Sequence, residues 1–577
     1  MKNTIYFLFL FFIISSCSKD ENNQVPNTIL KILVVDDKNN LISDAEVTTI
    51  PITTTVNTNI KGEAIINDIE PGDYTVKARL PEDIIDFRAK ITVKEGIQND
   101  VTIIVDPVDP ILPVGIKVDE IIAEAYERLN DRYIFDASGY VSYWGEIGSD
   151  KVYCNQDKYT VFTELDAYYF DQNNNLINSV WEAHYNLIVR TINYGLKELK
   201  EIEKELSPTE QIQKAELMFL RGLLYFNMVK LYGNPIVVTE DDYESVSLPD
   251  KQGGEKAYDL IISDLQFAKD NLPTFTSSKR ASKEAATALL GKVYLQSAGF
   301  PMQLEENYSK AIQQFEEVEG KFTLLQNYGA LFKNDLKENS EIIFKVDFDS
   351  SKNVGGNYGV LWGALGYSKH DFFKLSTSTV NDYFDQSSPL EFPVSFPIET
   401  ADKRFYQNIA TFKVEGGDKI NLEDKGEWRP YKYQKNIDTP VQEDNEDFDF
   451  ILIRYADILL MKAEAINAIS GPTSEALMLI NEVRRRAYSN ENHNISAGLS
   501  KSEFLQVILD ERAKEFFMEG YRKDDLIRTK MLESAINSYN EQSENNPKKH
   551  YQSHKYIWPI PAREIDLNPN AKQNPGY

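Results

Sequence analysis

The chain has 577 residues, and its 62 basic against 90 acidic residues give a formal net charge of −28. A field of that sign repels phosphate backbones, which excludes nucleic acid as a partner. With 42% apolar and 26% charged residues, the composition also excludes a polytopic membrane protein and a disordered chain. What remains is an acidic globular protein of about two to four domains. Its 32 Tyr, 30 Phe and 5 Trp residues must fill cores, binding surfaces or both.

The N-terminus carries an export signal. Its one long apolar run, IYFLFLFFII at residues 5–14, is shorter than the roughly 20 residues of a spanning helix, so residues 1–16 are predicted to be a signal peptide. The run ends in Ile14-Ser15-Ser16-Cys17, which resembles the lipobox of bacterial lipoproteins. The resemblance implies that Cys17 is lipidated and begins a polar tether over residues 17–27. Residues 18–21 (SKDE) resemble the signal for export to the outer face, so we expect an outer-membrane lipoprotein anchored there and facing the exterior.

A small all-β domain is predicted next, over residues 28–106. Apolar alternations at 29–35, 45–49 and 74–78 predict strands, and turn residues separate them. The sequence from LVVDDKNNLISDAEV to NDIEPGDYTVKA resembles the carboxypeptidase regulatory-like domain, which implies a β-sandwich. Three prolines then make residues 107–114 a stiff linker.

The remainder, residues 115–577, is predicted to be mainly helical. Helices are expected at 219–231, which ends before Gly233, and at 285–298 and 308–318. Leu290-Gly291-x-x-Tyr294 and Tyr308-x-x-Ala311-x-x-x-Phe315 resemble the tetratricopeptide spacing of a packed helix pair. A second pair is expected at 452–468 and 474–488. Between 341 and 450 the periodicity is lost, which predicts a long irregular insertion where ligand could bind.

The helical segments together resemble the SusD/RagB family of outer-membrane nutrient-binding lipoproteins, from about residue 115 to the end. The resembling stretches are FLRGLLYFNMVKLYGNPIVV at 219–238, AATALLGKVYLQSAG at 285–299, FILIRYADILLMKAEAIN at 450–467, ILDERAKEFFMEGYRKDDLIR at 508–528 and WPIPAREIDLNPNAKQNPGY at 558–577. The resemblance implies a SusD-like fold that captures oligosaccharides, or in some branches peptides. It also implies a partner, a SusC-type TonB-dependent transporter in the outer membrane.

Candidate ligand-binding residues are loop aromatics beside polar groups, because sugars stack on rings and hydrogen-bond to amides and carboxylates. Two segments have this composition, 140–153 and 357–367, and Trp428-Arg429 is a weaker third. The alternative is that these rings pack loop onto scaffold, as we expect for Trp181 and Trp558. The candidates are Tyr143, Trp144, Asp150, Tyr358, Trp362, Tyr367, Trp428 and Arg429.

No motif for catalysis, metal or cofactor stands out. His550 and His554 have the i, i+4 spacing of a helical metal pair but no adjacent Glu, so two solvated histidines are expected instead. The acidic run 443–449 lacks the Gly and terminal Glu of an EF-hand loop. We therefore expect a non-catalytic protein without cofactor or metal. The alternatives left open are a peptide-binding member of the same family, a surface glycoside hydrolase, and an adaptor that grips the transporter without touching ligand.

Overall fold

A computed structural model gives the fold in two compact units, residues 1–105 and 106–577, each of which is described by itself. The described residues are 28–36, 40–51, 53–79, 86–105, 117–131, 133–135, 144–154, 160–202, 205–242, 249–333, 338–349, 363–365, 373–384, 395–398, 400–433, 447–542 and 547–577. The predicted signal peptide, tether and linker, with Cys17, lie outside them.

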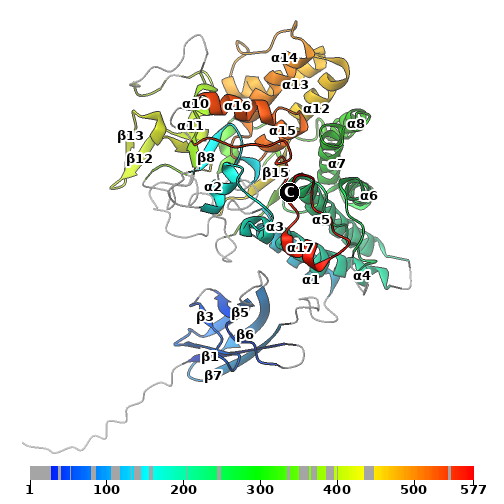
Figure 1. The fold of residues 1–577 in the computed structure, drawn as a ribbon, viewed down its shortest axis with the longest axis vertical. Coiled ribbons are helices and arrows are strands. Elements are labelled where there is room, and N and C mark those ends of the chain that lie inside the picture. Colours follow the sequence, from blue (N-terminus) through cyan, green and yellow to red (C-terminus); the bar gives the residue numbers. More distant parts are fainter. Residues whose placement is uncertain are drawn as a thin grey trace, which may run out of the picture. The chain divides into compact units, whose positions relative to one another are not determined.

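The first unit consists of two small β-sheets (Figure 1). In one sheet, β1 (Ile29–Asp36) lies between antiparallel β4 (Glu63–Asn67) and parallel β7 (Gln98–Val105). The side chains of Leu30, Ile32 and Val34 are fully buried, because alternate residues of a strand point to one face. The other sheet is antiparallel and has the order β3 (Val56–Asn57), β2 (Glu46–Ile50), β5 (Gly72–Arg79), β6 (Asp86–Val93). The strands predicted at 29–35, 45–49 and 74–78 are confirmed within one or two residues.

The second unit is mainly helical. Its central helices pack against one another in chain order, α5 (Pro208–Tyr232), α6 (Gly254–Asn271), α7 (Lys283–Ala298) and α8 (Asn307–Val318) (Figure 1). A capping box of Ser207 and Glu210 starts α5, and Gly233 ends it with a φ of 69°, which a glycine adopts without strain. The helix ends predicted from Gly233 and from residues 298 and 318 are therefore confirmed.

The tetratricopeptide-like spacing has the predicted packing role. A Cβ atom added to Gly291 would lie 2.4 Å from Cε1 of Phe315, so the absence of a side chain lets α8 approach α7. Helices α12 (Tyr455–Ser470) and α13 (Ser474–Tyr488) form the second pair, and α14 (Lys501–Glu515) also packs on α12. One boundary was wrong: residues 452–454 belong to strand β15 (Phe450–Arg454), which pairs with β9 (Ile342–Val346).

The described part of the 341–450 segment contains more regular structure than the predicted irregular insertion. Besides β9, strand β10 (Phe373–Leu375) pairs with β8 (Val152–Cys154), and β12 (Phe412–Glu415) forms a hairpin with β13 (Asp418–Asn421). Strands of three to five residues are too short to impose a period on the sequence. The remaining α-helices and β-strands of the described residues are α1 (Val118–Glu127), α2 (Thr160–Asp166), α3 (Asn175–Tyr185), α4 (Tyr194–Lys200), α10 (Thr377–Asn381), α11 (Phe405–Asn408), β11 (Ile409–Ala410), β14 (Arg429–Pro430), α15 (Arg522–Arg528), α16 (Leu532–Gln542) and α17 (Ala562–Leu567).

Buried ion pairs tie distant motifs together in the core of the second unit. Arg454 has no exposed surface, and its guanidinium donates to Glu519 at 2.8 Å, to Glu341 at 2.9 Å and to Glu515 at 2.6 Å. Arg404 is equally buried and donates to Glu511 at 2.7 Å. A buried charge is tolerated only when it is paired and hydrogen-bonded, and these groups meet that condition.

Trp181 and Trp558 lie in this core, 2% and 0% exposed, as predicted. None of the helices in the described ranges is long and apolar enough to cross a membrane.

Candidate functional site

Trp144, predicted to face ligand, lies in the interior. Its ring has no exposed surface, and its Nε1 donates to Asp524 Oδ1 at 2.7 Å. The ring of Trp558 meets it edge-on at 5.3 Å, and the Nζ atom of Lys523 lies 4.1 Å from its centroid. A ring without a free face cannot stack on a sugar, so Trp144 is a scaffold residue and its assignment as a ligand contact is corrected.

Asp150 is also a structural residue. Its two carboxylate oxygens accept from Nε and Nη2 of Arg522, both at 2.8 Å. Burial alone would raise the pKa of Asp150, but the charges of Arg522 and Lys151 outweigh it and hold that pKa well below its usual range. The carboxylate has its partners within the fold, so the assignment of Asp150 as a ligand contact is corrected too.

The weaker third candidate is likewise packed away. Trp428 has no exposed surface, and its Nε1 donates to the carbonyl of Leu422 at 2.9 Å. Arg429 is 5% exposed, and its Nη1 donates to the carbonyl oxygens of Gly426 and Trp428. Both side chains hold the turn between β13 and β14, so they too are scaffold residues.

Tyr143, Tyr358, Trp362 and Tyr367 lie outside the described residues and remain predictions. Between Trp362 and Tyr367 the structure describes residues 363–365. The main chain of Leu365 forms a parallel bridge to Lys413 on β12, and its carbonyl accepts from the N–H of Val414 at 2.7 Å.

The two candidate segments, about 200 residues apart in sequence, lead into one small β-ladder. Strand β8 begins within the first segment and β10 begins shortly after the second, and they pair antiparallel from Val152↔Leu375 to Cys154↔Phe373. Ser376 reinforces the pairing, because its hydroxyl donates to the carbonyl of Asp150 at 2.6 Å. The ladder therefore joins the described chain next to both candidate segments.

The segment 515–524 packs against residues 144–150 of the first candidate segment. A Cβ added to Gly145 would lie 2.2 Å from Cα of Gly520, so two backbones touch here. Beside them, Glu146 accepts from the N–H of Met518 at 3.0 Å, and burial raises the pKa of this carboxyl to about 8. This support could not be predicted, because the charged residues of 508–528 do not reveal their partners before the chain is folded.

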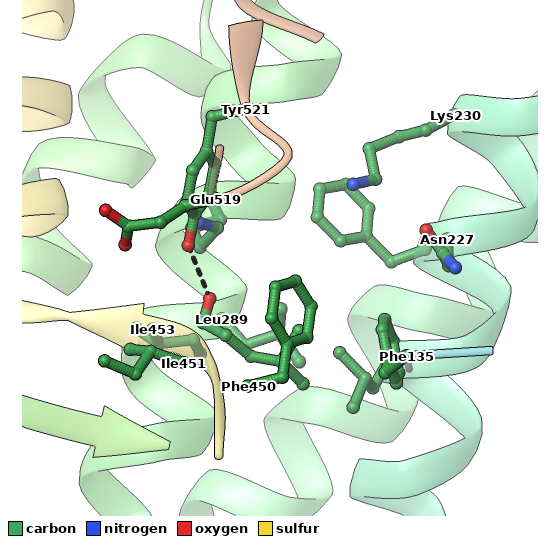
Figure 2. A pocket seen from close by; sticks show the side chains of 13 residues that line it. Phe135, Asn227, Lys230, Leu289, Phe450, Ile451, Ile453, Glu519 and Tyr521 are labelled. Atoms are coloured by element: carbon green, nitrogen blue, oxygen red, sulfur yellow. Dashed lines mark hydrogen bonds between the residues drawn. The ribbon is translucent and has the colours of Figure 1, made fainter. Parts of the chain in front are cut away.

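The cavity between α5, α7 and β15 is not a ligand pocket (Figure 2). Its volume is about 40 Å³, and apolar side chains such as Leu223, Leu289 and Phe450 form most of its wall. Tyr521 closes one side by donating its hydroxyl to the carbonyl of Leu452 at 2.8 Å (Figure 2). Ligand pockets measure roughly 300–1,000 Å³, so this cavity has room for about one or two waters and no sugar.

The two histidines spaced i, i+4 do not form a helical pair. His550 stacks on Tyr169 with centroids 4.9 Å apart, and His554 meets Tyr577 edge-on. Both lie in turns and extended chain after α16. Across the ranges that the structure describes, no group of three or more His, Cys, Asp or Glu side chains is placed to hold a metal ion.

Two family models match the second unit. Residues 340–577 match the one described as "SusD family", and residues 105–295 match "Starch-binding associating with outer membrane". The chain belongs to the SusD/RagB family. It is 26% identical to SusD-like protein P38 of Formosa agariphila, over 79% of this chain and 90% of the relative. It is 27% identical to the starch-binding protein SusD of Bacteroides thetaiotaomicron, over 63% and 73% of the two chains.

The SusD-like fold is also shown by solved structures. A SusD homologue from Bacteroides thetaiotaomicron superposes with a TM-score of 0.68 at 24% identity, covering 80% of this chain and 96% of that one. A laminarin-binding SusD-like protein superposes with a TM-score of 0.63 at 24% identity, covering 80% and 99%. The chain thus covers nearly the whole length of both solved structures.

Proposed function

We propose that this SusD/RagB protein captures oligosaccharides at the cell surface and passes them to a SusC-type TonB-dependent transporter, without catalysis. The family membership carries the proposal, since relatives across the helical unit include a starch-binding and a laminarin-binding protein. The β8–β10 ladder supports it, because the two aromatic loop segments lead into the same region. The side chains proposed to stack on sugar are Tyr143, Tyr358, Trp362 and Tyr367.

The test of this function is glycan binding without turnover. Trp362→Ala should raise the Kd of a bound oligosaccharide about tenfold, roughly 1–2 kcal/mol, because the loss of one ring removes its stacking surface. Isothermal calorimetry with a panel of neutral oligosaccharides measures it. Tyr169→Ala is the matched control, since this ring is 62% exposed and lies outside both segments.

Each alternative result has a different meaning. An unchanged Kd in Trp362→Ala would refute the site assignment alone. Release of new reducing ends from a bound glycan would make the protein a glycoside hydrolase. Binding of casein-type peptides in place of every sugar would make it a peptide-binding member of the family, and uptake that depends on the protein without any ligand affinity would make it an adaptor.

The proposed location is the outer face of the outer membrane, with acyl chains on Cys17 as the anchor. One matching family model is described as associating with the outer membrane, and residues 14–17 carry the lipobox-like sequence. Several acyl chains hold a protein far more firmly than one. Cys17→Ser should therefore release the protein from the membrane fraction, and protease added to intact cells should digest the unaltered protein. Survival of the protein under protease would contradict the outward orientation.

A further inference from the structure

A large groove lies on the helical unit, with a volume of about 1,080 Å³. It is bounded by the end of α7, the start of α8, the end of α12 and the start of α14 (Figure 1), together with residues 528–530 after α15. Its size reaches the upper end of the range of ligand pockets, about 1,000 Å³. The groove shares no lining residue with the loop segments of the proposed site, so it is a separate feature.

The groove is rigidly built. The N–H of Phe300 donates to the carbonyl of Arg528 at 2.9 Å, and a Cβ added to Gly299 would lie 2.4 Å from Cγ of Arg528. The guanidinium of Arg528 in turn binds both carboxylate oxygens of Glu464 at 2.8 Å. The turn between α7 and α8 is therefore held against Arg528, which is itself paired with α12. A ligand would meet a preformed surface.

The groove presents polar groups that the fold leaves unused. Among the described residues, the hydroxyl of Tyr308 and the side-chain amide of Gln303 have no hydrogen-bond partner. Tyr308 is half-buried, so its ring offers an apolar face beside its hydroxyl. The ring of Phe300 lies near them and packs edge-on against Tyr556 at 4.8 Å. An aromatic surface beside free hydroxyl and amide groups is the combination that binds a sugar ring.

The charges of the groove select a neutral ligand. Three carboxylates line it, those of Glu305, Glu306 and Glu464, and three cationic groups balance them, those of Lys501, Arg528 and Lys530. This balance is local, because the whole chain carries a net charge of −28. Because the charges of the lining cancel, the groove attracts neither a polyanion nor a polycation strongly. The binding of a neutral polar ligand does not depend on net charge.

We propose that this groove is a second binding site for neutral oligosaccharides, separate from the loop site; the proposal rests on the proposed function. A peptide fits less well. Extended peptides commonly bind by adding a strand to a sheet edge, and the groove is lined by helix ends and turns.

Two variants test the groove without disturbing the fold. Tyr308→Phe removes the hydroxyl and keeps the ring. Gln303→Gly removes the amide at a residue whose φ of 56° glycine adopts readily. Tyr169→Phe is the control, because this exposed tyrosine lies outside the groove. Isothermal calorimetry on the full chain, with α- and β-glucan, mannan and xylan oligosaccharides, should give two equivalents of a bound glycan. Each groove variant should weaken one of them at least fivefold, and Trp362→Ala should not affect that one.

The possible results separate this proposal from the proposed function. One equivalent that is lost in Trp362→Ala and unchanged in both groove variants would overturn the groove and leave the function standing. One equivalent that is weakened only by the groove variants would support the groove as the sole sugar site. Binding of no oligosaccharide in the panel, or of peptides alone, would overturn both.

Discussion

Replacement of Arg454 with methionine is expected to lower the free energy of unfolding by about 3–5 kcal/mol. The guanidinium gives five hydrogen bonds to Glu341, Glu515 and Glu519, one of them to the backbone carbonyl of Glu515. Methionine keeps much of the side-chain volume but leaves fully buried carboxylates with fewer partners. The cost is mainly that of uncompensated buried charge. Urea unfolding followed by circular dichroism would measure it.

Arg563→Met is the matched control for this variant. The side chain of Arg563 is 63% exposed, and its Nη1 lies 3.6 Å from Oε1 of Glu182. Exposed pairs contribute about 0–1 kcal/mol, so this variant should unfold within that range of the unaltered protein. Equal losses in the two variants would show that the buried network contributes no more than a surface pair.

The helices and strands that could be predicted were those with a long period or a clear end. The helix of residues 474–488 was predicted to the residue, because an apolar face recurs through it and Thr473 caps it. Strand β15 was missed because its residues 450–454 run directly into α12 without a turn signal. The β8–β10 and β9–β15 ladders were missed because their strands are short and their pairing partners are distant in sequence.

The candidate site was predicted less well, since the sequence does not distinguish a buried ring from an exposed one in a non-periodic segment. The Gly and polar residues around Trp144 and Trp428 favour a binding loop, yet both rings are buried and donate an indole N–H within the fold. The partner of Trp144, Asp524, lies 380 residues away and is set by tertiary structure, whereas the partner of Trp428, the carbonyl of Leu422, lies in the same turn. Local composition could therefore indicate which segments belong near the site, but it could not identify which side chains face outward.

Acid should unfold the protein through its buried carboxylates. Burial alone would raise the pKa of Glu511, but Arg404, Lys514 and Arg484 outweigh it and lower that pKa from 4.5 to about 2. In the same way Lys292 and Arg512 lower the pKa of Asp457 to about 2. The unfolded chain then binds more protons than the folded one between about pH 4.5 and pH 2. Stability should be fully present above that window and fall through it, by on the order of 3 kcal/mol for Glu511 alone.

Glu146 should change the pH dependence of stability in the opposite direction. The variant Glu146→Gln is therefore the control. Burial raises the pKa of this carboxyl from 4.5 to about 8, so the folded chain binds the extra proton between those values and stability falls as the pH rises through them. Glutamine does not titrate, so this variant should show a smaller change of stability with pH between pH 5 and 8. Its loss of stability below pH 4.5 should equal that of the unaltered protein. Melting temperatures of the unaltered protein and of Glu146→Gln, measured from pH 2 to pH 9, would check both slopes. If the melting temperature of the unaltered protein did not change between pH 4.5 and pH 2, the buried carboxylates would not have lowered pKa values in the folded state.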